Sequence, residues 1–99
     1  GHALILPKEH YANLYELDDK IAEKVLVLAK QMVTKLTDIL GCDGYNIIQN
    51  NGIVAGQSVF HYHMHLIPRY KEDTVDIKWE LGNLTDKDKE YILKKMNEK

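Results

Sequence analysis

The sequence has a single cysteine, two prolines and no marked excess of charge of either sign. With Cys42 alone, no internal disulfide can form, which favours a reducing compartment and predicts the cytoplasm. The formal net charge of −2 gives no basic surface that would hold nucleic acid by its phosphates. No apolar run approaches the ~20 residues that a membrane helix requires. We therefore expect a protein that binds neither nucleic acid nor membrane.

The composition is that of an ordinary globular domain. Hydrophobic residues make up 44% of the chain and charged residues 28%, whereas disordered chains have fewer apolar residues and a larger net charge. Ninety-nine residues form one domain at most, and no linker-like tract divides them. We expect a single domain over residues 1–99.

Hydrophobic spacing predicts most of the secondary structure. A short apolar run, residues 3–6, is typical of a strand. Residues 18–40 carry apolar side chains at helical spacing, with Asp18 as the N-cap and Gly41 just past the end. Strands are expected over residues 45–49 and 59–67.

The C-terminal part of the chain is predicted to form a loop followed by a second helix. Residues 71–84, which include Trp79, lack a clear period and are expected to form a loop, with Trp79 as a core or dimer anchor. A final helix is expected to begin near Thr85. These elements predict an α+β fold, in which an antiparallel sheet has a long helix packed on one face and a short C-terminal helix follows.

The most informative feature is a row of three histidines, His61, His63 and His65. In a strand, side chains alternate between faces, so the three imidazoles share one face with neighbours ~7 Å apart. The intervening apolar residues are expected to pack beneath the long helix: Phe60, Tyr62, Met64 and Leu66.

Three interpretations of this row remain open. Histidine could be incidental on a solvated face. The row could bind a metal, although Zn²⁺ usually takes four ligands and no Cys, Asp or Glu accompanies the row on its face. Alternatively, a neutral imidazole could act as a nucleophile toward phosphorus, with the neighbouring histidines fixing its tautomer and protonating the leaving group.

The loop before the row is suited to phosphate. Residues 50–58 contain Gly56, where backbone can approach an anion closely, and Ser58, which adds a hydroxyl. Consecutive N–H groups of such a loop can form an anion-binding nest.

The combined pattern resembles the histidine triad family. That family has alternating histidines after a Gly-Gln-[Ser/Thr]-Val segment, and a Gly-His segment further upstream. The matching stretches here are Gly56-Gln57-Ser58-Val59-Phe60-His61-Tyr62-His63-Met64-His65-Leu66-Ile67 and Gly1-His2-Ala3-Leu4-Ile5-Leu6-Pro7-Lys8-Glu9-His10. The resemblance covers residues 1–70 closely and the remainder loosely.

The resemblance implies a nucleotide-binding hydrolase that acts at the α-phosphate of nucleoside phosphoramidates or related conjugates. By position, His63 would be the nucleophile that forms a nucleotidyl-histidine intermediate. His65 would assist the leaving group, with His61 and His2 supporting the site. The residues implied to contact substrate are Asn50, Gly56, Gln57 and Ser58.

The resemblance also implies a homodimer, a nucleoside monophosphate or nucleotide conjugate as ligand, and no required cofactor; zinc occurs in some longer members. Such members carry roughly forty further residues before the Gly-His segment, comparable to two short strands and a helix. We therefore expect an N-terminally truncated domain whose exposed sheet edge makes it dimeric or unstable. Two other functions stay open, a non-catalytic nucleotide-binding or regulatory module and a zinc-binding histidine-strand protein.

Overall fold

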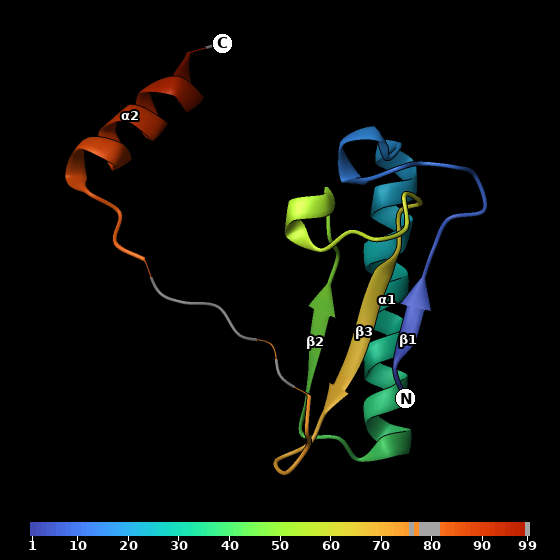
Figure 1. Cartoon of the computed structure of the whole chain (residues 1–99). Coiled ribbons are helices and arrows are strands. Elements are labelled where there is room, and N and C mark those ends of the chain that lie inside the picture. The colour runs from blue at the N-terminus through green and yellow to red at the C-terminus, as the bar shows by residue number, and fades with distance from the viewer. Residues whose placement is uncertain (76, 78–81, 99) are drawn as a thin grey trace.

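The computed structural model describes residues 1–75, 77 and 82–98, and the predicted position of Trp79 lies outside these ranges. Its strands are short and its first helix is long (Figure 1). In chain order the elements are β1 (Ala3–Ile5), the 3₁₀ turn η1 (Leu14–Glu16), α1 (Asp19–Leu40), β2 (Gly44–Ile48), the 3₁₀ turn η2 (Ile53–Ala55), β3 (Met64–Arg69) and α2 (Asp86–Asn97).

Helix α1 begins and ends where the sequence predicts. The Asp18 side chain accepts hydrogen bonds from the backbone N–H groups of Lys20 and Ile21. At the other end, Gly41 adopts the left-handed conformation with φ of 63° and donates its N–H to the carbonyl of Thr37. Both caps satisfy backbone groups that the helix itself leaves without partners.

The sheet has three antiparallel strands in the order β1-β3-β2, so β3 is central. Leu4 lies opposite His65 in one ladder, and Ile48 lies opposite the same residue in the other. Helix α1 runs along one face of the sheet (Figure 1). The predicted α+β class, with the long helix on one face, is confirmed.

The core lies between α1 and β3. Leu66 and Ala29 are fully buried, one from each element. Their neighbours in the buried cluster are Ile5, Leu17, Val25, Tyr62 and Met64.

The predicted strand over residues 59–67 is wrong at its start. The strand β3 begins at Met64, because the last pairs of the two ladders are Ile5↔Met64 and Ile48↔His65. Before that point the flanking strands supply no hydrogen-bond partner. Phe60 was expected to pack beneath the long helix, but its side chain is exposed. The alternation nevertheless holds from Tyr62 onward, since Tyr62, Met64 and Leu66 are buried.

The end of β3 is fixed by an ion pair. Arg69 donates from Nε and Nη2 to the two carboxylate oxygens of Asp73, at 2.8 and 3.0 Å. These bonds, together with the N–H of Tyr70, lower the pKa of Asp73 to about 2. Arg69 also donates to Asn46 on β2, so it joins the sheet to the segment that follows it.

Helix α2 begins after Thr85, as expected, and the Thr85 hydroxyl caps the N–H of Asp88. None of its described side chains is buried. Within the described residues, no helix is long and apolar enough to cross a membrane.

Candidate active site

The three histidines of the row lie together on one side of the sheet, each half-buried. His65 belongs to β3, whereas His61 and His63 lie in the irregular segment that leads into the strand, with His61 at a bend. The His63 and His65 rings meet edge to face, with centroids 5.0 Å apart. The same-face arrangement that alternation predicts is therefore present although the hydrogen-bonded ladder begins only at residue 64.

A backbone contact fixes the tautomer of His63. Its Nδ1 lies 2.7 Å from the carbonyl oxygen of His61. A carbonyl can only accept, so Nδ1 carries the proton and donates. In the neutral ring, Nε2 then keeps its lone pair, which is the form that a nucleophilic imidazole needs.

His61 is held on both sides by the segment that follows β1. Its Nε2 donates to the carbonyl of Pro7 at 3.0 Å. Its Nδ1 lies 3.1 Å from Nδ1 of His10, and the two rings stack. Since Nε2 of neutral His61 carries the proton, His10 is the donor in this pair. In the sequence, His10 was identified only as part of the stretch that resembles the family's Gly-His segment, and no role in the chemistry was predicted for it.

His2 pairs with His65 in a similar way. The His2 Nε2 and the His65 Nδ1 are 3.0 Å apart across the β1–β3 ladder. Burial lowers the pKa of His65, and the neighbouring His63 and His2 lower it further. The structure thus brings all four histidines that the resemblance singled out into one group, with His10 attached through His61.

The lowered pKa of His65 predicts that stability depends on pH. The unfolded chain, with a histidine pKa near 6.5, takes up the proton more readily than the folded chain does. Stability is therefore complete above that value and is lost as the pH falls through the lower pKa of the folded state. We expect the urea midpoint to decrease between about pH 8 and about pH 5.

The His65→Gln variant provides the control for this pH dependence, because it removes the titrating group and keeps a polar side chain. The decrease should become smaller in the variant. An identical decrease in parent and variant would assign the effect to other groups.

The predicted phosphate loop contains a compact turn instead of an open nest. The N–H groups of Ala55 and Gln57 donate to the carbonyl of Gly52, and that of Gly56 donates to Ile53. The predicted nest of consecutive free N–H groups is therefore not formed at these residues. Gly56 has a φ of 97°, which favours glycine.

Two of the predicted substrate contacts remain available on this loop. The Ser58 side chain is exposed. The Asn50 side chain is partly buried and lies against Gly56, where a Cβ would stand 3.6 Å from its Nδ2.

Gln57 is placed differently from Asn50 and Ser58. Its side chain is 3% exposed, and both ends of its amide bond the backbone. A contact between Gln57 and substrate stays a prediction. Two residues that the sequence did not single out, Gln49 and Asn51, exchange hydrogen bonds beside it.

The histidine row borders a hollow of about 220 Å³ lined by Val59, by Leu4 and Leu6, and by the three histidines of the row. Leu4 also lines a neighbouring hollow of about 340 Å³ together with His2 and His65. These two hollows are therefore lined by both apolar side chains and imidazole side chains.

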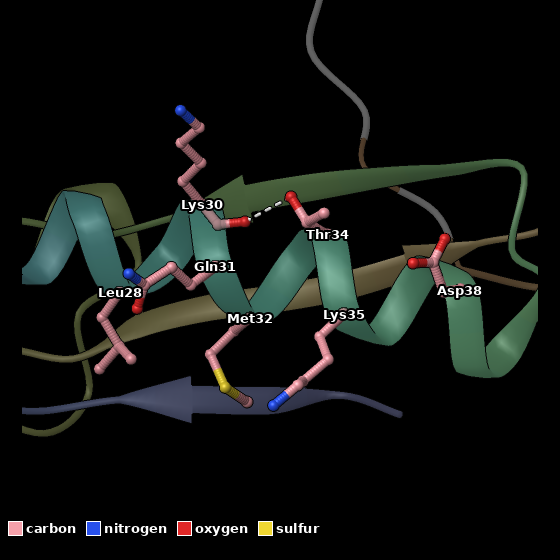
Figure 2. A pocket seen from close by; sticks show the side chains of 7 residues that line it. All are labelled: Leu28, Lys30, Gln31, Met32, Thr34, Lys35 and Asp38. Carbon is pink, nitrogen blue, oxygen red and sulfur yellow. Dashed lines mark hydrogen bonds between the residues drawn. The ribbon is translucent and has the colours of Figure 1, made fainter.

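A larger hollow, of about 690 Å³, lies elsewhere. It runs along α1, and all seven of its lining residues come from that helix (Figure 2). Thr34 in its wall donates to the carbonyl of Lys30. Its lining contains no histidine or cysteine, so we assign the chemistry to the smaller hollow at the row.

The residues described do not assemble a metal centre. Over residues 1–75, 77 and 82–98, no three His, Cys, Asp or Glu side chains are placed to hold an ion. Cys42 lies at the end of α1, where its Sγ donates to Thr37.

Comparisons with known proteins agree with the geometry. Residues 1–72 match the family model described as the HIT domain. The chain is similar to the Hit protein of Bacillus subtilis, at 43% identity over 81 residues, covering 81% of this chain and 56% of that protein. It is also similar to an adenosine 5′-monophosphoramidase of Schizosaccharomyces pombe, at 45% identity over 73 residues, covering 74% of this chain and 52% of that protein.

A solved structure supports the same relationship. The crystal structure of a histidine triad nucleotide-binding protein from Candida albicans superposes with a TM-score of 0.83 at 33% identity, covering 98% of this chain and 71% of that one. The chain spans about half the length of the two curated relatives.

Proposed function

The chain belongs to the HIT family, and from that premise we propose that it hydrolyses nucleoside phosphoramidates or related nucleotide conjugates at the α-phosphate. The observation that supports this most directly is the hydrogen bond from His63 Nδ1 to the His61 carbonyl, because it leaves Nε2 of the neutral ring as a nucleophile. The proposed intermediate is a nucleotidyl group on that nitrogen.

In the first step, the lone pair of His63 Nε2 forms a bond to phosphorus and the bond from phosphorus to the leaving amine breaks. Protonated His65 gives the amine its proton. Its hydrogen bond to His2 orients the ring.

In the second step, water attacks phosphorus and the bond to His63 breaks. The attacking water returns a proton to the His65–His2 pair and nucleoside monophosphate is released. Asn50, Gly56 and Ser58 are proposed to contact the phosphate. We also propose that the protein is a homodimer in the cytoplasm.

The proposal predicts that the protein releases AMP from adenosine phosphoramidate. ³¹P NMR measures this release in samples with and without a chelator. We expect turnover at the same rate in both samples, because each proposed step uses only imidazole nitrogens and water. The rate of AMP release should also fall as the pH is lowered through the range where histidines titrate, since a protonated His63 cannot attack.

Two results would contradict the proposal. Saturable binding of AMP without any product would indicate a nucleotide-binding module. Turnover or stability that disappears with the chelator and returns with Zn²⁺ would indicate a metal protein.

A further inference from the structure

The buried side chain of Gln57 joins three separate stretches of backbone. Its Nε2 donates to the carbonyl of Ala12 at 2.6 Å and to that of Val59 at 3.1 Å. Its Oε1 accepts the N–H of Gly52 at 2.8 Å. Both amide hydrogens and the amide oxygen are thus used inside the protein.

A second amide strengthens the same junction. Asn51 Oδ1 accepts the N–H of Leu14 at 2.8 Å, and Asn51 exchanges two bonds with Gln49. The N–H of Tyr62 donates to the carbonyl of Tyr11. Residues 11–14 are therefore tied at three points to residues 51–62, in a region where no strand ladder supplies these bonds.

This junction lies next to the reacting groups along the chain. Ser58 stands between Gln57 and the Val59 carbonyl that Gln57 holds. Two residues further on, the carbonyl of His61 receives Nδ1 of His63. A displaced backbone at Val59 would move the Ser58 hydroxyl, which precedes it in the chain. It would also move the His61 carbonyl, two residues later, that orients His63.

We propose that Gln57 is a positioning residue and not a substrate contact. Its amide fixes the loop so that Ser58 and His63 meet the same phosphorus atom. This inference rests on the proposed hydrolase function, and it assigns to Gln57 a role different from the one that the resemblance implies. A misplacement of about 1 Å at a reacting group can cost ~10²-fold in rate.

The test variant is Gln57→Met, which keeps the length of the side chain and its lack of charge but removes all three bonds. The control is Gln31→Met, the same change on an exposed residue of α1 far from the histidines in sequence (Figure 2). Adenosine phosphoramidate turnover is measured per active site, with sites counted from the nucleotidyl-enzyme trapped by an alkaline denaturing quench, which preserves a phosphorus–nitrogen bond.

We expect Gln57→Met to lower the rate constant per active site ~10²-fold, with an unchanged acid limb of the pH profile, and Gln31→Met to leave it within about twofold. A purely structural role would reduce only the number of active sites. A rate constant per site within about twofold of the parent would therefore overturn the proposal.

Two further measurements keep the inference testable if Gln57→Met does not fold or if the parent shows no turnover. In parent protein, the Gln57 side-chain amide hydrogens should be slow to exchange and should keep their NMR shifts when AMP is added. Shifts that follow AMP saturation would show a substrate contact and overturn the proposal. An inactive parent would refute the hydrolase function. In that case, AMP binding at least tenfold weaker in Gln57→Met than in Gln31→Met would support positioning if the parent's Gln57 amide shifts are unchanged by AMP, and equal binding would refute it.

Discussion

Replacing His63 with alanine should reduce AMP release from adenosine phosphoramidate by roughly 10⁴-fold or more, because it removes the nitrogen that is proposed to form the bond to phosphorus. The other two histidines of the row hold hydrogen bonds of their own. His61 uses its Nε2 proton on Pro7 and its Nδ1 on His10, and His65 faces His2. ³¹P NMR of the product gives the measurement.

The matched control is His10→Ala, which also removes one imidazole but leaves the bond between His63 Nδ1 and the His61 carbonyl. We expect its rate to stay within about tenfold of the parent, since His61 keeps its bond to Pro7. Parent protein denatured at alkaline pH during turnover should carry a nucleotidyl group that His63→Ala lacks. Retention of more than about one per cent of the parent rate by His63→Ala would exclude His63 as the nucleophile.

Replacing Leu66 with alanine should lower the free energy of unfolding by about 2–5 kcal/mol. Leu66 is fully buried on the central strand, between the sheet and α1, so truncation removes apolar contacts and leaves a cavity. Urea unfolding followed by circular dichroism measures the change. A loss of this size is a large part of the total stability of a small domain.

Ile47→Ala is the matched control, because Ile47 lies directly opposite Leu66 in the β2–β3 ladder and is 49% exposed. We expect a loss below about 1.5 kcal/mol there, since truncation at a surface site leaves no closed cavity. Equal losses for the two variants would mean that Leu66 does not lie in the core as described.

The sequence alone determined the features that depend on nearest neighbours along the chain. Asp18 and Gly41 bound α1 because capping uses groups within one turn of the helix end. Two-residue alternation placed Tyr62, Met64 and Leu66 on the buried side and the three histidines on the other. The family motif then identified the histidine row as a chemical site, and the comparisons confirm the family.

Only the tertiary structure decided which groups the histidines meet. His2 and His65 are 63 residues apart in the chain, and His10 and His61 are 51 apart, so no local pattern predicts either pair. The start of β3 was mispredicted because it depends on where β1 and β2 cease to pair. Gln57 appeared as a polar loop residue, yet its amide is buried because residues 12 and 52 approach it from other segments. Propensity acts over a few residues, whereas hydrogen-bond partners and burial are set by the folded chain as a whole.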